Sequence, residues 1–226
     1  MALRAIVFDF DGVIANSEPL HFRGYRDVLA EEGVALTEQD YYAQYLGFDD
    51  VGAFEAIGRR HGAAWSREQI RDLVSRKAVR LEELEGDVSV LFPGAADAIR
   101  RACDAMPIAI ASGARGDEIR RVLMREGLSH CFTAIVAAED TPVSKPAPDP
   151  YLRAIALLAP ALGDRLEAAH CVAIEDSHWG LESARGAGLR TVAVTNTYAA
   201  DLLTADLTIS SLHDMDLDLL DRLCST

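Results

Sequence analysis

Apolar residues form short uninterrupted runs in the first ten residues and again in the second half of the chain. Runs without alternating polar positions are typical of strands buried on both faces of a parallel sheet. Stretches with helical spacing separate the later runs, and this alternation also predicts a parallel sheet. The predicted strands are Ala5–Phe8, Ile108–Ala111, Ala134–Ala137, Cys171–Ile174, Thr191–Val194 and, as a further candidate, Leu207–Ile209. The predicted helices lie near Ala95–Cys103, Asp117–Glu126, Pro150–Leu158 and Leu181–Ala187.

The region between residues 16 and 90 has a different pattern. No strand-like run occurs from Thr37 to about Gly86, and both Ser17-Glu18-Pro19-Leu20 and Ser66-Arg67-Glu68-Gln69 are typical helix starts, the second as a capping box. Helical spacing predicts an amphipathic helix with Ile70, Leu73, Val74, Leu81 and Leu84 inside and Arg71, Arg76 and Arg80 exposed. The expected small core of this block consists of Tyr41, Tyr42, Tyr45, Phe48, Phe54 and Trp65.

The helical block therefore interrupts a sheet domain after its first strand. We expect an α/β fold with a Rossmann-like parallel sheet core, formed by residues 1–15 and 91–226, and an inserted all-helical cap domain, formed by residues 16–90. Open α/β sheets bind ligands at the carboxyl ends of their strands. The insertion is accordingly expected to act as a lid over that edge.

Composition adds limits on partners and location. The chain has 226 residues, half of them apolar, and a formal net charge of −14. No apolar run approaches the roughly 18 residues of a membrane span, and the first residues do not have the pattern of a signal peptide. Four scattered cysteines are expected to be reduced thiols. We expect a cytoplasmic protein that binds neither nucleic acid nor membranes, because its charge repels both.

Two carboxylates follow the first strand directly. Asp9 and Asp11 are two residues apart, so on an extended backbone both side chains would project to the same side. If the extended geometry breaks at Phe10, Asp11 turns away and offers its backbone carbonyl instead. A simpler interpretation is that Asp9 ends the strand and Asp11-Gly12 only forms a turn.

Polar groups also follow three later strands. Ser112-Gly113-Ala114-Arg115 is a plausible anion cradle, although Ser-Gly after a strand is more often only a turn. Lys145 precedes a stiff proline-rich bend, which favours a fixed ammonium over a solvated one. Glu175-Asp176 is a second acidic pair at a strand end. Two acidic clusters with a lysine and a serine have the composition of a magnesium and phosphate site.

The sequence resembles the haloacid dehalogenase superfamily, whose four motifs appear here in the family's order. They are Asp9-Phe10-Asp11-Gly12-Val13, Ser112, Lys145 and Glu175-Asp176. The resemblance covers essentially the whole chain and is strongest to the β-phosphoglucomutase-like and sugar-phosphate phosphatase subgroup, whose helical cap follows strand one. It implies that Asp9 is a nucleophile that becomes an aspartyl phosphate and that Asp11 is the general acid and base. Ser112 and Lys145 would hold the phosphoryl group. Mg²⁺ would be bound by Asp9, the Asp11 carbonyl and Asp176, with Glu175 assisting directly or through water.

The same resemblance implies cap and loop residues that bind substrate. The candidates are His21, Gly47 and Lys77 in the cap and Gly113 and Arg115 after the second strand. A histidine on a helix surface often has no role, so His21 could also be a plain surface residue. In the mutases an arginine near the position of Gly47 grips the distal phosphate. This chain has Asp49-Asp50 there, and carboxylates would repel that anion.

These residues predict a Mg²⁺-dependent phosphatase that acts on a small phosphorylated metabolite, a sugar or polyol phosphate, as a monomer or weak homodimer. A phosphomutase is the alternative. Dehalogenases and phosphonate-cleaving relatives replace the acid that Asp11 supplies. Receiver-type phospho-acceptor modules lack a cap, and a non-catalytic binding protein would be expected to lose Asp9 or Asp11.

Overall fold

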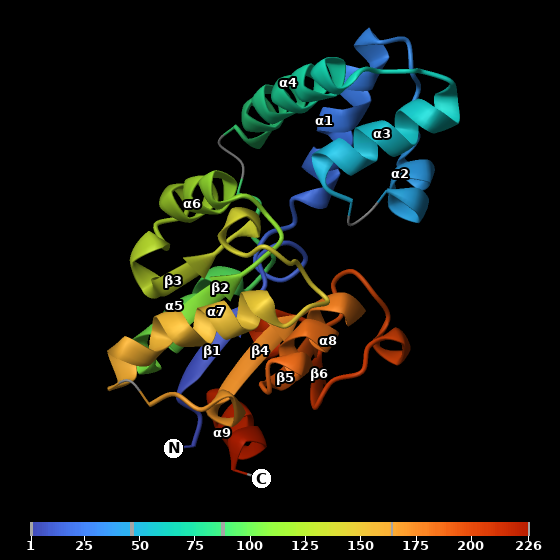
Figure 1. Cartoon of the computed structure of the whole chain (residues 1–226). Helices are drawn as coiled ribbons and strands as arrows, with labels where there is room; N and C mark the ends of the chain where they lie inside the picture. Colours follow the sequence, from blue (N-terminus) through green and yellow to red (C-terminus); the bar gives the residue numbers. More distant parts are fainter. Residues whose placement is uncertain (1, 46–47, 87–88, 164, 226) are drawn as a thin grey trace. The chain divides into compact units, whose positions relative to one another are not determined.

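The chain forms two compact units. The computed structural model describes residues 2–45, 48–86, 89–163 and 165–225 (Figure 1). One unit, the core unit, comprises Met1–Asn16 and Val90–Thr226, and the other, the cap unit, comprises Ser17–Ser89. The cap unit is thus inserted into the core unit after the first strand. Each unit is described below by itself.

The described residues of the core unit form a six-stranded sheet in the order β3-β2-β1-β4-β5-β6, and every neighbouring pair is parallel. The strands are β1 (Ala5–Phe8), β2 (Ile108–Ala111), β3 (Phe132–Val136), β4 (Cys171–Glu175), β5 (Arg190–Val194) and β6 (Leu207–Ile209). Phe8 pairs with Ile110 and with Ile174, so three neighbouring strands end at nearly the same level. This confirms the Rossmann-like parallel sheet and brings the polar residues after β1, β2 and β4 to one edge.

Helices cover the sheet. They are α5 (Ala95–Ala105), α6 (Gly116–Arg125), α7 (Asp149–Leu158), α8 (His178–Gly186) and α9 (Leu217–Cys224), with short 3-10 turns between elements. In Figure 1, α7 crosses in front of β1 and β2, and its Tyr151, Ala154 and Leu158 pack on Ala5 and Val7 of β1. Residues of β1, β2 and β4 are buried, which explains the uninterrupted apolar sequence of β1, of β2 and of β4 up to Ile174.

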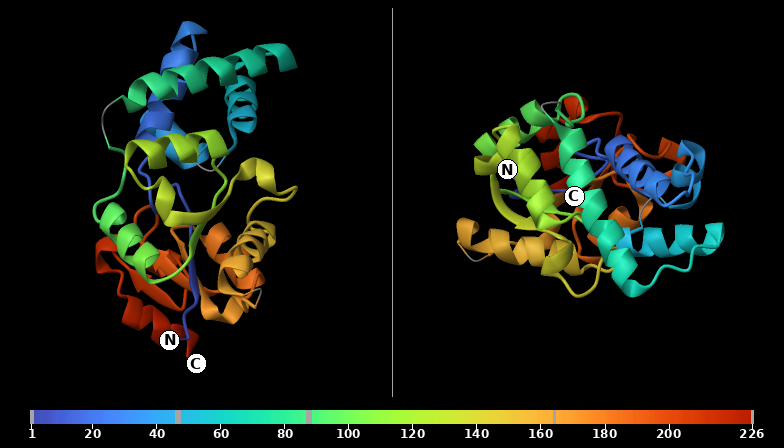
Figure 2. Two further views of the ribbon diagram at one scale, coloured as in Figure 1. Left: turned by 90° about the vertical axis from the view of Figure 1, so that its left-hand side faces the viewer. Right: turned by 90° about the horizontal axis from the view of Figure 1, so that it is seen from above.

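Element bounds differ from the sequence prediction by local effects. β3 starts at Phe132 rather than Ala134, and helix α8 starts at His178 rather than Leu181. The earlier start of α8 follows from Ser177, whose hydroxyl accepts a hydrogen bond from the Gly180 amide as a helix cap. Helix α9 was not predicted. The backbone N of Leu3 donates to the Asp221 carboxylate of α9, which can be found in red at the bottom of the left view of Figure 2.

In its described residues the cap unit forms the helices α1 (Glu18–Glu31), α2 (Glu38–Gln44), α3 (Asp50–His61) and α4 (Arg67–Glu85). Thr37, Asp49 and Ser66 cap the last three, and Ser66 and Gln69 form the predicted capping box. The sequence prediction of an all-helical block is therefore confirmed for the described residues, although it gave no separate bounds for α3.

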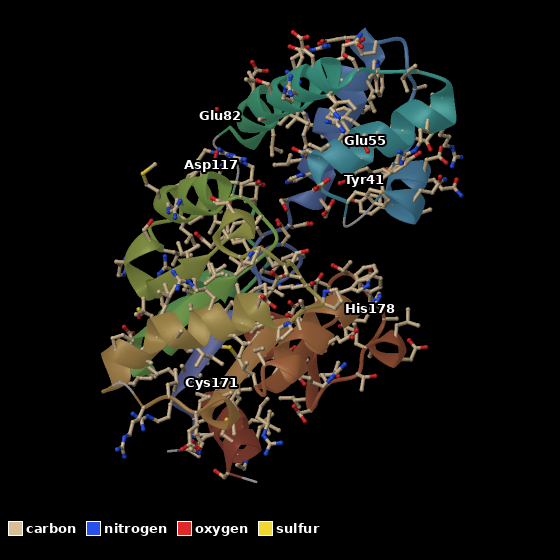
Figure 3. All side chains as sticks on the ribbon, viewed as in Figure 1. Tyr41, Glu55, Glu82, Asp117, Cys171 and His178 are labelled. Carbon is tan, nitrogen blue, oxygen red and sulfur yellow. The ribbon has the colours of Figure 1, made fainter. Side chains whose placement is uncertain are left out.

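The cap core differs in part from the prediction. Tyr41, Tyr45 and Phe54 are buried, and Tyr41 can be followed on α2 in Figure 3. Tyr42 and Phe48 are 36% and 50% exposed, so their assignment to the core was wrong. Tyr42 directly follows Tyr41 on α2 and therefore projects from a different side of that helix. Phe22 and Tyr25 of α1 complete the core instead, with the Tyr25 ring 5.1 Å from that of Phe54.

Helix α4 shows which charges are solvated and which are not. Ile70, Leu73 and Leu81 are buried as predicted, whereas Val74 and Leu84 are only half-buried. Arg71 is exposed, but Arg76 and Arg80 form ion pairs with α1: Arg76 Nη1 lies 2.7 Å from Glu32, and Arg80 Nε lies 2.9 Å from Asp27. These two arginines therefore tie α4 to α1 rather than standing free in water.

Among the described residues, no helix is both long enough and apolar enough to cross a bilayer.

Candidate active site

Asp9 stands at the carboxyl end of β1 and is 8% exposed. Its backbone N donates to the Ile174 carbonyl at 2.9 Å, which extends the pairing of β1 with β4 by one residue. The Lys145 ammonium lies 2.8 Å from Asp9 Oδ1 and 2.6 Å from Glu175 Oε1. Lys145 comes from the loop before α7, so residues 136 positions apart in the chain form one ion pair.

The backbone turns sharply after Asp9. The amides of Ile14 and Ala15 both donate to the Phe10 carbonyl, and Gly12 has a φ of 78°. The extended geometry therefore ends at Phe10, which is the condition of the second alternative for Asp11. Asp11 is half-buried in the turn and is not one of the carboxylates that cluster with Asp9.

Glycine is required at position 12 for a second reason. A Cβ on Gly12 would lie 1.9 Å from Asp176 Oδ2, so the turn after β1 rests directly on the Asp176 carboxylate. The loop after β5 contacts both this turn and the Asp176 carboxylate. Asn196 Nδ2 donates to the Gly12 carbonyl at 2.8 Å, and the Thr197 hydroxyl donates to Asp176 Oδ2.

Glu175 is completely buried, and hydrogen bonds occupy both of its carboxylate oxygens. Oε1 accepts from Lys145 and, at 2.8 Å, from the Tyr151 hydroxyl, while Oε2 accepts from the Asp176 amide and the Ser177 hydroxyl. A Cβ on Gly180 would lie 1.8 Å from Oε1, which fixes glycine in the first turn of α8. Glu175 thus holds Lys145 in place beside Asp9.

Asp9, Glu175 and Asp176 form a buried acidic cluster in which one oxygen from each lies within 4.8 Å of the others. Burial raises the pKa of Asp9 to about 6, although Lys145 opposes the shift. Burial, together with the charges of Asp9 and Glu175, raises the pKa of Asp176 well above its ordinary value. In the described part of the cluster one ammonium faces three carboxylates. This excess of buried hard oxygen ligands fits a divalent cation such as Mg²⁺.

Ser112 follows β2 and is 4% exposed. Its backbone N continues the strand pairing to the Val136 carbonyl, and its Oγ accepts a hydrogen bond from the Ala114 amide at 3.0 Å. Gly113 is exposed, and a Cβ there would meet no atom within 4 Å. Arg115 directly precedes α6 without a side-chain capping bond, and its Nε lies 3.1 Å from Asp117 Oδ1. Ser112 is thus placed at the strand ends as expected, whereas Arg115 is already paired with an acid.

Comparisons with known proteins agree with this arrangement. The sequence profile of the haloacid dehalogenase-like hydrolases matches residues 3–188. The chain belongs to this family. It is 33% identical over 224 residues to the protein CbbY of Rhodobacter capsulatus, covering 94% of this chain and 95% of CbbY. It is 30% identical over 199 residues to the fructose-1-phosphate phosphatase YqaB of Escherichia coli (strain K12), covering 84% and 95%. Membership of this family makes the chain a hydrolase, and phosphatases are among its relatives.

A solved structure gives the same result for the fold. CbbY from Rhodobacter sphaeroides, determined in complex with phosphate, superposes with a TM-score of 0.79 at 26% sequence identity and covers 94% of this chain and 96% of its own. A mutant of this CbbY has also been determined in complex with xylulose-(1,5)bisphosphate. Haloacid dehalogenase-like hydrolases thus share this fold over nearly the full chain.

The cap residues of this hydrolase form a cluster of their own. Lys77 is 1% exposed, and its ammonium lies 2.5 Å from Asp50 Oδ1 and 2.9 Å from His21 Nδ1. The Tyr25 hydroxyl donates to the same Asp50 oxygen at 2.6 Å. Asp49 caps α3 through the Gly52 amide. Gly47, the remaining cap candidate, lies outside the described residues.

This cluster corrects one premise of the sequence analysis. Asp49 and Asp50 were treated as two free carboxylates that would repel a distal phosphate. Asp49 is a helix cap, and the charge of Asp50 is balanced by Lys77. The Lys77–Asp50 pair is therefore neutral, the Lys77 ammonium is already engaged, and Asp49 is the carboxylate at this position that has no cation beside it in the described structure.

We expect Lys77→Met to lower the free energy of unfolding by about 2–4 kcal/mol at neutral pH, because it leaves the half-buried Asp50 carboxylate without its cation. Burial alone would raise the pKa of Asp50, but Lys77 and the hydrogen bonds from Lys77 and Tyr25 lower it below its ordinary value. The pair therefore contributes fully above the ordinary carboxyl pKa, and its contribution is lost as the pH falls through the lowered one.

Urea unfolding at neutral and acid pH measures this effect. The difference between wild type and Lys77→Met should shrink below about pH 4. Arg71→Met, which removes an exposed cation from the same helix, is the matched control and should change the unfolding free energy by less than about 0.5 kcal/mol. A pH-independent difference would refute the role of the Asp50 charge.

Sequence reasoning missed three residues that this geometry brings to the acidic cluster. Tyr151 is the second residue after Asp149 in α7, and nothing local distinguishes its hydroxyl from that of any core tyrosine. Asn196 and Thr197 could have been found, because they are polar residues directly after β5 at the edge where the other motifs end. The rule that located Ser112 applies equally to them.

Proposed function

We propose that this hydrolase is a Mg²⁺-dependent phosphatase that releases phosphate from a small sugar or polyol phosphate through an aspartyl phosphate on Asp9. The observation that carries the proposal is the buried contact of Asp9 with Lys145 inside a cluster of three carboxylates. An anionic nucleophile can approach an anionic phosphate only where nearby cations offset the repulsion. Lys145 supplies one such cation.

The reaction would proceed in two displacements. Asp9 attacks phosphorus, the bond to the ester oxygen breaks, and Asp11 gives that oxygen a proton. Water then attacks phosphorus, Asp11 takes the proton of that water, and the bond from phosphorus to the Asp9 oxygen breaks to release phosphate. Dividing the reaction in this way makes each step easier than a single direct hydrolysis. Ser112 and Lys145 would hold the transferred group in line.

The residues present fit Mg²⁺, which Asp9, Asp176 and the Asp11 carbonyl would hold. When bound, the ion would neutralise charge on the phosphoryl oxygens. Glu175 would have a different role, because both of its oxygens already accept hydrogen bonds. We propose that it fixes Lys145 and contacts the metal only through water. Uncatalysed phosphate-monoester hydrolysis is so slow that enzymes accelerate it by up to about 10²¹-fold. Positioning and charge stabilisation must supply most of this rate enhancement.

Relatives support the substrate class. Their names include hexitol phosphatase B and fructose-1-phosphate phosphatase YqaB of Escherichia coli (strain K12), and CbbY from Rhodobacter sphaeroides has been determined with a sugar bisphosphate. We extend this class to the present chain, with a small phosphorylated metabolite as its partner. We also propose that the protein acts in the cytoplasm as a monomer or weak homodimer. His21, Lys77, Gly113 and Arg115 remain candidates for substrate contact.

A hydrolysis screen tests the proposal. Phosphate release from a panel of sugar phosphates, polyol phosphates, phosphoglycolate and nucleotides would be measured with Mg²⁺ for wild type and for Asp9→Asn. We expect sugar or polyol phosphates to be turned over fastest, and only by wild type. Preference for nucleotides would reject the substrate class, and equal rates for both proteins would reject the mechanism.

A phosphomutase is the second candidate, because a β-phosphoglucomutase of Bacillus subtilis (strain 168) is 27% identical over 226 residues. A mutase must hold a bisphosphate by its non-transferring phosphate, and a bidentate arginine contact of this kind is worth about 1.5–3 kcal/mol. At the corresponding position this cap has the Lys77–Asp50 pair, whose ammonium already has an anionic partner.

We therefore expect phosphate release rather than isomerisation of β-glucose 1-phosphate, with no need for glucose 1,6-bisphosphate. Phosphorus NMR follows both products at once, with and without the bisphosphate. Formation of glucose 6-phosphate much faster than phosphate release would favour the mutase.

A further inference from the structure

The loop that follows β5 contacts both acidic strand ends of the core unit. Thr195 leaves β5 with its amide bonded to the Ile209 carbonyl at 3.1 Å. The next residue, Asn196, donates from its side chain to the Gly12 carbonyl in the turn after β1. Thr197 donates from its hydroxyl to Asp176 Oδ2 after β4. Two successive side chains thus connect the two segments that carry the acidic cluster.

A second contact holds this loop against α8. The Tyr198 ring meets the His178 ring edge-on, with centroids 5.6 Å apart, and His178 stacks on Trp179 at 3.9 Å. Tyr198 also packs against the small apolar cluster of Leu181, Ala193 and Leu203. His178, at the start of α8 in Figure 3, is two residues after Asp176, so the loop is fixed on both sides of its hydrogen bond to that carboxylate.

The contact with Thr197 fixes the orientation of the Asp176 carboxylate. Oδ2 lies over Gly12 and accepts from Thr197, and a Cβ on Gly12 would be only 3.0 Å from the Thr197 hydroxyl. No donor from the described residues contacts Oδ1. Rotation of the carboxylate would break the bond from Thr197, so the hydroxyl keeps Oδ1 available in one orientation.

We infer that Asn196 and Thr197 are positioning residues for the cation site, a conclusion that rests on the proposed function. Thr197 orients the Asp176 carboxylate, and Asn196 fixes the peptide of Gly12, which directly follows the Asp11 carbonyl. Partners of this kind, which hold a ligand without touching the metal, commonly change metal affinity or activity by about 10–100-fold when they are removed. The loop after β5 thereby sets the affinity of the site for Mg²⁺.

The test compares variants that differ by one donor. Thr197→Val removes the hydroxyl at nearly constant shape, whereas Thr197→Ser keeps it. Thr197 is exposed apart from this contact, so neither change disturbs the core. Mg²⁺ binding to the substrate-free protein is measured by isothermal titration calorimetry, and melting temperatures are measured in EDTA. We expect Thr197→Val to raise the Kd for Mg²⁺ about tenfold and Thr197→Ser to change it by less than about twofold.

Asn196→Ala is the second, independent variant. It removes the donor to the Gly12 carbonyl and should also weaken Mg²⁺ binding severalfold, while Asp176→Asn marks the loss of a direct ligand. If Thr197→Val lowers the melting temperature in EDTA but leaves the Kd unchanged, the hydroxyl is merely structural and the inference is overturned. If wild type itself binds no Mg²⁺, the proposed function fails. If wild type binds Mg²⁺ and no loop variant changes the Kd, only the inference about the loop fails.

Discussion

Replacing Asp9 by asparagine is expected to reduce turnover by roughly 10⁴-fold or more while leaving the fold intact. The amide is nearly the same size as the carboxylate, but it is a poor nucleophile and cannot form the acyl phosphate through which the reaction would proceed. Asp9 is also the partner of Lys145, so the variant leaves Lys145 with Glu175 as its remaining carboxylate contact. Steady-state phosphate release and circular dichroism measure the two parts of this expectation.

Two variants make the result specific. Asp97→Asn removes an exposed carboxylate from α5 and should retain wild-type turnover. Asp11→Asn keeps the nucleophile but removes the general acid and base, for which a loss of about 10²–10⁴-fold is typical. More than a trace of activity in a well-folded Asp9→Asn protein would remove Asp9 from the role of nucleophile.

Chelation of divalent cations should abolish activity, and added Mg²⁺ should restore it. Three buried carboxylates share the charge of Lys145, and the two oxygens of Glu175 already have donors, so Asp9 and Asp176 are left without a sufficient positive charge. Without the cation, the phosphate would meet these anions directly. Activity titrations after EDTA treatment measure the requirement.

The identity of the ion gives a sharper form of this experiment. Ca²⁺ is larger and less strict in geometry than Mg²⁺, so it should bind but support little turnover. Asp176→Ala should raise the Mg²⁺ concentration needed for half-maximal activity sharply. Full activity in excess EDTA would show that the acidic cluster has no catalytic cation.

The sheet and the core of the site could be predicted because short segments carry their signals. Ala5–Phe8 and Ile108–Ala111 are buried on both faces, and their sequences therefore contain no polar position. Parallel strands end at one edge, so Asp9, Ser112 and Glu175 could be placed together from chain order alone. The contact between Lys145 and Asp9 needed the motif resemblance, because the loop of Lys145 has no regular spacing that places its ammonium.

The remaining details depend on tertiary contacts that no local pattern records. Lys77 occupies the apolar stripe of α4 because Asp50 and His21 meet its ammonium there, yet a lysine in a helix usually predicts an exposed position. The hydrogen bonds of Tyr151 with Glu175 and of Thr197 with Asp176 join residues 24 and 21 positions apart. Such bonds are decided by how loops approach one another, which the sequence pattern does not specify.

The stereochemical course of hydrolysis tests the two-step displacement through Asp9 most directly. A thiophosphate monoester made chiral at phosphorus with oxygen isotopes would be hydrolysed by wild type with Mg²⁺ in water of a third oxygen isotope, and the configuration of the released thiophosphate would be determined. Each in-line displacement inverts phosphorus, so an enzyme that first transfers the group to Asp9 and then to water gives overall retention. Retention is the predicted result, and inversion would show direct attack by water and contradict the aspartyl phosphate.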